Sequence, residues 1–296
     1  MMKWPLHMVD FGYYGPDSVA WKVNREWVVL LGGTRAVLMQ IAHPLVAMGV
    51  SKHSTYMTDP FGRAARTFLL GEKLTFGSSR TARQAARTIN NLHKHVHGHL
   101  SDTSGAFAGG TRYDARDPAL LLWVHATLVD SLLLSYQVFV APLTHAEEEQ
   151  YYQESKEVAH LLGLTKTQMP QSIDDLKAYI SGMIHSDVLA PTLQARELAH
   201  QTLFPPAPGL LRPLMHLNLN ITNALLPQPV REIYNLEWSA SQQRAFELST
   251  RGMRMLIPHL PGIWRELPLT RRLMRGEIRR SASMDERRVS AKQHLR

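Results

Sequence analysis

Hydrophobic positions along the chain recur with the spacing of α-helices. Apolar residues repeat at intervals of three and four, and prolines and capping residues separate the stretches. The run after Asp117 is the clearest case, because Asp117 can cap free amides, Pro118 suits a first helical turn, and the apolar pattern continues towards Pro142. No stretch shows alternating strands joined by hairpin turns. The pattern predicts an all-α protein.

The breaks in this pattern are short. FPPAPG at 204–209 and LPQP at 226–229 can each be a corner between packed helices. We therefore expect a single helical domain over residues 1–270. Besides the helix after Asp117, the expected helices cover residues 17–31, 34–56, 60–74, 80–97, 145–162, 172–186, 189–202, 209–225, 240–258 and 268–280.

Positive charge collects at the C-terminal end. The chain has 33 Lys and Arg against 25 Asp and Glu, a net charge of +8. From Thr270 to Arg296, nine basic residues stand against three acidic ones. Residues 271–296 are therefore expected to be a solvated basic tail, with an anionic membrane surface as one candidate contact. The body has no base-reading or RNA-binding motif, so no nucleic-acid partner is expected.

Two segments, 36–51 and 119–141, are apolar enough to raise the question of a membrane span. The first is too short, and the second contains His125 and Asp130, which are costly near a bilayer centre. We interpret both as buried helices without a transmembrane role, and Asp130 as hydrogen-bonded or paired with an arginine. The first residues lack an apolar run of signal-peptide length, so a cytoplasmic location is expected.

Four histidines alternate in LHKHVHGHL, residues 92–100. On a helix over 80–97, His93 falls on an apolar stripe, His95 points to the polar side, and His97 lies at the border. The stripe also contains Ala85, Ala86, Ile89, Leu92 and Val96. An inward imidazole on such a helix suits a haem pocket, and it equally suits a hydrogen-bonded core histidine.

Arg63, Arg66 and Thr67 in DPFGRAARTF share one helix face. This face is either an arginine-rich surface or a set of donors for carboxylate or oxygen ligands. His43, His53 and His125 also lie in apolar surroundings, where each is a satisfied core or boundary residue or a part of a site. The chain has no cysteine, which excludes disulfides, thiolate metal sites and cysteine nucleophiles.

Several blocks together resemble the MpaB-type oxygenase family, which includes the latex clearing proteins, a group of rubber oxygenases. The similarity runs from about Gly15 to Arg272. The blocks are GGTRAVLMQIAHPLVAMGVSKHSTYMTDPFGRAARTF, LHKHVHG, DPALLLWVHATLVDS, YYQESKEVAHLLG and LLPQPVREIYNLEWS. The resemblance implies a globin-like helical core that binds haem b and acts with dioxygen on a hydrophobic substrate, with alkene-containing or prenyl-like molecules as candidates.

Two motifs carry the expected site. Arg63-Ala-Ala-Arg66-Thr67 is similar to the R-x-x-K-T motif of the rubber oxygenases, and the segment beginning at His93 is similar to their H-x-x-V-R motif. The resemblance implies His93 as the iron ligand and Arg63, Arg66 and Thr67 as haem or oxygen contacts. Arg66 and His97 replace the family's lysine and arginine, so polyisoprene is not implied as the substrate. In this hypothesis His43 or His53 carries protons and His125 contacts the cofactor.

Two alternatives stay open from the residues alone. One is a non-haem metal hydrolase or oxygenase that uses several histidines together with Asp59 or Asp130. Its candidate ligands are His43, His53, His93 and His125. The other is a helical binding or scaffold protein in which these histidines are structural and the basic tail contacts a partner.

Overall fold

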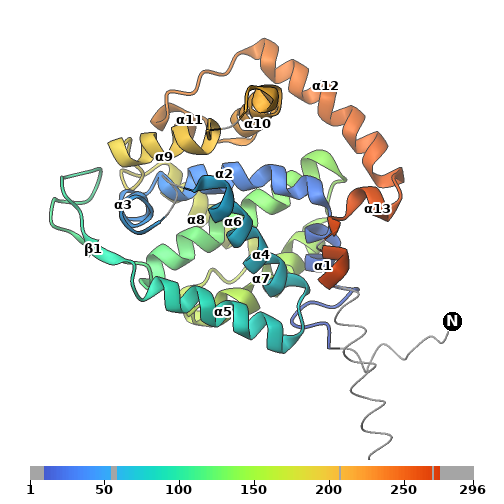
Figure 1. The fold of residues 1–296 in the computed structure, drawn as a ribbon, viewed down its shortest axis with the longest axis horizontal. Helices are drawn as coiled ribbons and strands as arrows, with labels where there is room; N and C mark the ends of the chain where they lie inside the picture. The colour runs from blue at the N-terminus through green and yellow to red at the C-terminus, as the bar shows by residue number, and fades with distance from the viewer. Residues whose placement is uncertain (1–9, 55–58, 207, 269, 274–296) are drawn as a thin grey trace, which may run out of the picture.

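Helices make up nearly all of the ordered structure (Figure 1). The computed structural model describes residues 10–54, 59–206, 208–268 and 270–273. Within these ranges the strands are β1 (His97–His99) and β2 (Arg112–Asp114), which pair antiparallel with Gly98 opposite Tyr113. The predicted helical class is therefore confirmed, with one small hairpin that the pattern did not predict.

The longest helix, α6 (Pro118–Phe139), lies in the middle of the protein. It begins where the sequence predicts, because the Asp117 side chain accepts a hydrogen bond from the Ala119 amide at 2.9 Å and Pro118 occupies the first turn. Its neighbours include α2 (Gly32–Ile41), α7 (His145–Leu161) and α8 (Ile173–Ile184). One hydrophobic core runs through these helices, from Tyr14 to Ile257.

The remaining helices surround this centre. They are α1 (Val19–Asn24), the 3-10 helix η2 (Trp27–Leu31), α3 (Pro44–His53), α4 (Pro60–Phe76), α5 (Ser79–His93), the 3-10 helix η4 (Lys166–Gln168), α9 (Leu193–Leu203), the 3-10 helix η5 (Gly209–Leu211), α10 (Arg212–Leu225), α11 (Gln228–Ile233), α12 (Ala240–Leu256), the 3-10 helix η6 (Ile257–His259) and α13 (Gly262–Arg265).

The helix predicted over 34–56 is in fact two helices. The chain bends by 107° between the segment formed by η2 and α2 and the next helix, α3. Pro44 has no amide hydrogen to continue the first helix, and His43 adopts an extended backbone with its Nδ1 accepting from the Leu45 amide at 3.3 Å. His43 thus ends one helix and caps the next.

The helix predicted over 80–97 ends at His93. The Val96 carbonyl accepts from the Ala115 amide at 2.9 Å, and His97 pairs with Asp114 in the hairpin. Pairing with a distant segment therefore replaces the last turn of the helix, and Val96 and His97 do not belong to the helical stripe.

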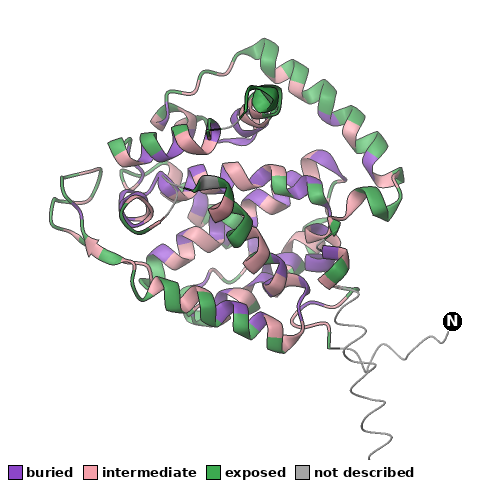
Figure 2. Cartoon of the chain, viewed as in Figure 1, coloured by how far each residue is buried: buried purple, intermediate pink, exposed green. Residues whose placement is uncertain are grey.

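By length and composition α6 could cross a membrane, as could the bent pair η2–α2 and α3 if taken as one span. In α6, however, 56% of the apolar window is buried inside the protein. Figure 2 shows this concentration of buried residues on the central helices. Most of the predicted helix 268–280 and of the basic tail 271–296 lies outside the described residues.

Candidate functional site

Helices α4 and α5 form an antiparallel hairpin that is closed near its turn and open at its far end. Near the turn, Leu70 and Leu74 of α4 share a hydrophobic cluster with Ala85, Ala86 and Ile89 of α5. Figure 1 shows the two helices diverging from the turn at Gly77 and Ser78. The packing face of each helix therefore continues beyond the part that the partner helix covers.

The predicted site residues continue these two faces. Arg63 and Thr67 lie on the face of α4 that carries Leu70, at spacings of seven and three residues, and His93 lies four residues after Ile89 on α5. Arg63 and His93 are half-buried, whereas Thr67 is exposed. Arg63 and His93 thus lie towards the ends of α4 and α5 that are remote from the turn.

His93 is the last residue of α5, and burial makes its neutral form the favoured one. Burial lowers the pKa of its imidazole, with Asp114 opposing this effect. Its ring nitrogens make no hydrogen bond to any residue in the described ranges. The predicted stripe is buried at Ala85 and Ala86, while Leu92 is 58% exposed. His93 is therefore a neutral imidazole with an uncommitted nitrogen at the edge of the packed core.

Neighbouring helices cover α6 on two flanks. On one flank the Arg35 guanidinium of α2 donates to the Ser131 hydroxyl of α6 at 2.6 Å. On the other, His125 Nε2 of α6 lies 3.3 Å from the Ser155 hydroxyl of α7. On a helix, Ser131 and His125 lie about 120° apart, so a strip of the α6 surface lies between the two flanks.

This strip of α6 is apolar and is uncovered at its middle residue, Leu128, while Val124 and Leu132 are half-buried. It carries Val124, Leu128 and Leu132 at intervals of four residues, and Leu128 is 42% exposed although it lies midway along a core helix. The opposite side is filled by α8, where the Trp123 ring contacts Tyr179 with centroids 6.4 Å apart. In Figure 1, α4 crosses in front of α6. An apolar wall therefore lies between the two flanks, on the side away from α8.

Comparison with protein families assigns the chain to a family. Residues 21–255 match the family described as ER-bound oxygenase mpaB/B'/rubber oxygenase, catalytic domain. The chain belongs to this family. Two uncharacterised proteins, one from Mycobacterium bovis and one from Mycobacterium tuberculosis, are each 28% identical over 235 residues, which cover 75% of this chain and 88% of theirs. No solved structure matches the chain.

In this member of the oxygenase family, His43 has a structural place. It caps α3, is 5% exposed, and its ring lies against Phe107 with centroids 5.1 Å apart. Burial lowers the pKa of His43 to about 4. A base with that pKa stays unprotonated at neutral pH, so His43 is poorly suited to the proton-carrying role proposed for it.

His53 differs from His43 in its exposure. It is the exposed last residue of α3, and its Nε2 lies 3.1 Å from the Tyr113 hydroxyl of β2. His125, on the flank of α6, is half-buried, and burial and the nearby Lys156 lower its pKa to about 4. Of the predicted proton carriers, His53 is thus the one exposed enough to exchange protons with water.

Arg66 is anchored at the start of α4. Asp59 caps this helix by accepting from the Gly62 amide at 2.9 Å, and its other carboxylate oxygen lies 3.0 Å from Arg66 Nη1. Both side chains are more than half exposed. The arginine that replaces the family's lysine is therefore held by a carboxylate at the mouth of the hairpin.

The non-haem metal alternative finds no support in the described part of the chain. No three His, Asp or Glu side chains come together there in a group that could hold a metal ion. Asp130 instead pairs with Arg35, with Nη2 and Oδ2 2.6 Å apart, as the sequence predicted. Arg35 also donates to the Leu225 carbonyl at 2.8 Å, so this ion pair joins α2, α6 and α10.

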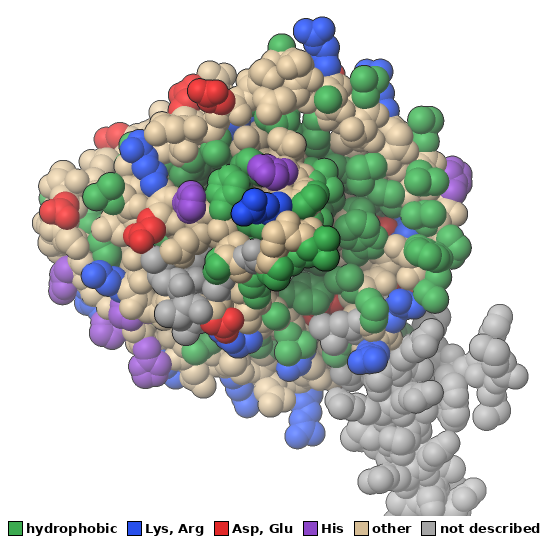
Figure 3. Space-filling view, turned by 45° about the horizontal axis from the view of Figure 1, so that its top comes forward, with side chains coloured by type: hydrophobic (Ala, Val, Ile, Leu, Met, Phe, Trp, Pro, Cys, Tyr) green, Lys and Arg blue, Asp and Glu red, His purple; other side chains and the backbone are tan. Residues whose placement is uncertain are grey.

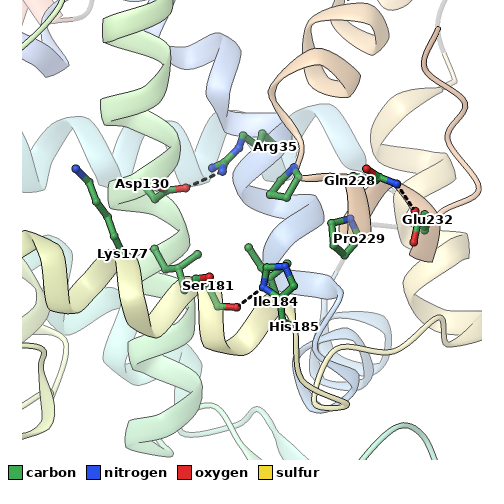
Figure 4. A pocket seen from close by; sticks show the side chains of 11 residues that line it. Arg35, Asp130, Lys177, Ser181, Ile184, His185, Gln228, Pro229 and Glu232 are labelled. Carbon is green, nitrogen blue, oxygen red and sulfur yellow. Dashed lines mark hydrogen bonds and ion pairs between the residues drawn. The ribbon is translucent and has the colours of Figure 1, made fainter. Parts of the chain in front are cut away.

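The sequence did not reveal a cleft of about 630 Å³ on the α8 side of α6 (Figure 4). Arg35 and Asp130 lie in its wall together with Lys177 and His185 of the α8 region and Glu232 of α11. Asp130 lies two residues from Leu128, about 200° around the helix, so the cleft and the uncovered strip are on opposite sides of α6. Asp130, a charged residue within the apolar run of α6, was the sequence signal that could have indicated this cleft.

Proposed function

We propose that this oxygenase is haem b-dependent and acts with dioxygen on a hydrophobic molecule, for which an alkene-containing or prenyl chain is the favoured class. One observation carries the proposal: His93, a half-buried neutral imidazole without a hydrogen bond to any described residue, ends α5 at the open end of the α4–α5 hairpin, the end at which α4 carries Arg63. The globin-like arrangement implied by the sequence resemblance is part of this proposal.

The residues present fit the group. A neutral imidazole nitrogen is a common axial ligand of haem iron, and the His93 nitrogens have no other partner among the described residues. The uncovered strip with Leu128 offers an apolar surface to a flat ring system. Arginine side chains such as Arg63 suit propionate carboxylates, because the guanidinium donates in a fork geometry.

Bound haem would supply the binding and activation of dioxygen. The chain's own residues have separate tasks in this proposal. Arg63 would orient carboxylates at the mouth, and Arg66, held in position by Asp59, would offer its remaining guanidinium donors there. His53 Nε2 takes up or returns a proton through the Tyr113 hydroxyl. Leucines such as Leu128 exclude water and bind the apolar substrate.

Titration of the full chain with hemin tests this function. We expect the wild-type protein to develop a Soret band with one-to-one stoichiometry, and His93→Ala to bind hemin at least about tenfold more weakly. His95→Ala is the matched control, because His95 is an exposed histidine two residues away. It should bind like the wild type, and far-ultraviolet circular dichroism should show all three folded.

Two results would contradict the proposal. One is a wild-type protein without a Soret band at saturating hemin. The other is equal hemin affinity of the His93→Ala and His95→Ala variants, which would place the iron ligand elsewhere.

A further inference from the structure

The cleft on the α8 side of α6 takes no part in the proposed haem chemistry. It encloses about 630 Å³, which lies within the range of sites for small molecules. Figure 4 shows that its lining side chains come from α2, α6, the second half of α8 and the start of α11. Segments from distant parts of the chain therefore meet around one cavity of ligand size.

The positive charges in the wall of the cleft are already paired. Lys177 Nζ lies 2.6 Å from the Glu148 carboxylate, and Figure 4 shows the Lys177 side chain turned away from the other lining residues. Arg35 uses its Nε and both Nη atoms in contacts with neighbouring groups, among them the Asp130 carboxylate at 2.6 Å. An anionic ligand would have to compete with these carboxylates for the two cations.

The groups that remain free in the cleft are hydrogen-bond acceptors. Asp130 Oδ2 contacts Arg35, while its Oδ1 has no partner in the described part of the chain. Glu232 accepts from the Gln228 amide through one oxygen, at 2.9 Å, and forms no ion pair with a described residue. His185 Nδ1 lies 2.8 Å from a backbone carbonyl and must donate to it, so Nε2 of the neutral ring is an acceptor. A ligand that satisfies these groups must donate hydrogen bonds.

The rest of the lining is apolar and partly covered. Hydrophobic side chains also lie open on the surface of the molecule, as Figure 3 shows for one face. In the cleft, by contrast, Ile180 is 5% exposed, and Ile184, Pro227 and Pro229 are half-buried. These side chains come from α8 and from the start of α11, so they offer an apolar body contacts from two segments.

We propose that this cleft binds a small organic cation, a protonated amine that carries an apolar body. The ammonium group donates to Glu232 and to Asp130 Oδ1, and the apolar body lies against Ile180 and Ile184. A cation is favoured over a neutral donor because Glu232 brings a negative charge that no described cation neutralises. The site uses no residue of the α4–α5 hairpin and requires no cofactor, so its success or failure is independent of the proposed haem chemistry.

Isothermal titration calorimetry of the full chain tests the site with three probes that share one apolar body. They are 2-phenylethylamine, which is protonated at neutral pH as a lysine is, 2-phenylethanol and 3-phenylpropionate. We expect one-to-one binding of the amine that weakens as the salt concentration rises. The alcohol should bind about fivefold more weakly, because it lacks the charge, and the carboxylate more weakly still.

Replacement of the free carboxylate tests the electrostatic part of the proposal. Glu232→Gln should weaken binding of the amine roughly threefold to fivefold, as expected for an exposed charge, and should leave binding of the alcohol unchanged. Glu237→Gln is the matched control, because Glu237 is also exposed but does not line the cleft. It should bind the amine like the wild type.

A second pair of variants tests the position of the ligand. Ser181 is an exposed residue in the wall of the cleft, so Ser181→Trp should fill the cavity and weaken binding of the amine more than about tenfold. Gly182→Trp is the matched control, since Gly182 does not line the cleft and a Cβ atom there would meet nothing within 4 Å. Equal urea midpoints would show that both variants fold.

Four results would overturn the proposal. The first is a wild-type protein that does not bind the amine at millimolar concentration. The second is a carboxylate probe that binds as tightly as the amine, and the third is equal amine affinity of Ser181→Trp and Gly182→Trp. The fourth is displacement of the amine by hemin, which would place the cofactor in the cleft. His93→Ala should bind the amine like the wild type whether or not hemin binding is lost.

Discussion

At Gly32 the contact between α2 and α6 leaves no space for a methyl group. A Cβ atom there would lie 2.2 Å from the Ser135 hydroxyl oxygen and 2.6 Å from the Ser131 carbonyl oxygen, both on α6. At the next residue, Gly33, a Cβ atom would meet nothing within 4 Å. Gly32→Ala and Gly33→Ala therefore make the same chemical change in a crowded and in an open position.

The two contacts at Gly32 differ in how easily they are relieved. The Ser135 side chain can rotate, but the Ser131 carbonyl belongs to the α6 backbone, so α2 and α6 must separate by at least 0.4 Å to reach 3.0 Å. Overpacking of this kind costs about 1–3 kcal/mol. Replacing glycine by alanine within a helix stabilises by at most about 1 kcal/mol. We expect Gly33→Ala to be neutral or slightly stabilising and Gly32→Ala to lose about 1–3 kcal/mol.

Urea unfolding followed by circular dichroism measures both effects. The free energy of unfolding comes from linear extrapolation, and equal slopes in the three proteins show that the unfolding transition is comparable. The difference between the two variants isolates the packing cost from helix propensity. Equal urea midpoints for Gly32→Ala and Gly33→Ala would refute the close approach of α2 and α6.

Three further predictions concern buried charge. Asp130→Asn should lower the free energy of unfolding by about 2–4 kcal/mol, because it leaves the buried Arg35 guanidinium without its partner; Arg35→Met combined with Asp130→Asn should recover part of this loss in urea unfolding. The folded-state pKa of His43, about 4, lies below its unfolded value of 6.5, so the unfolded chain takes up the proton first as the pH falls. The wild type should therefore lose about 3 kcal/mol more stability between pH 7.5 and pH 4 than His43→Asn. Burial raises the pKa of Glu72 in α4 to about 7 from 4.5, so its folded state loses stability as the pH rises through that range. Glu72→Gln should gain on the wild type by about 3 kcal/mol between pH 4.5 and pH 8 in the same assay.

Local signals predicted where most helices begin. Asp117 with Pro118 predicted the start of α6, and in the structure the capping box of Thr144 and Glu147 at the start of α7 is an equally local contact, within three residues. Such contacts depend only on neighbouring residues, so the sequence contains them in full. The same reasoning placed Arg63, Arg66 and Thr67 on one face of α4, since helical spacing alone decides it.

Long-range contacts account for the errors. The hairpin of β1 and β2 joins residues 97–99 to residues 112–114, and the pattern near His93 gave no sign of that partner. Leu92, expected on the inward stripe, is 58% exposed in the last turn of α5. The break at His43 was readable from Pro44, but its sharp turn places α3 against α9, a packing that local spacing does not specify.

The sequence by itself determined that the chain is helical, that it resembles this oxygenase family, and that Arg63, Arg66 and Thr67 share one helix face. These depend on residue types and on spacing within one helix or one motif. Only the tertiary structure decided that α4 and α5 diverge, that α6 keeps one apolar side uncovered at Leu128, and that α10 and α12 expose leucines. The reason is physical: helical periodicity fixes which residues share a face, whereas packing between distant segments decides whether that face is covered.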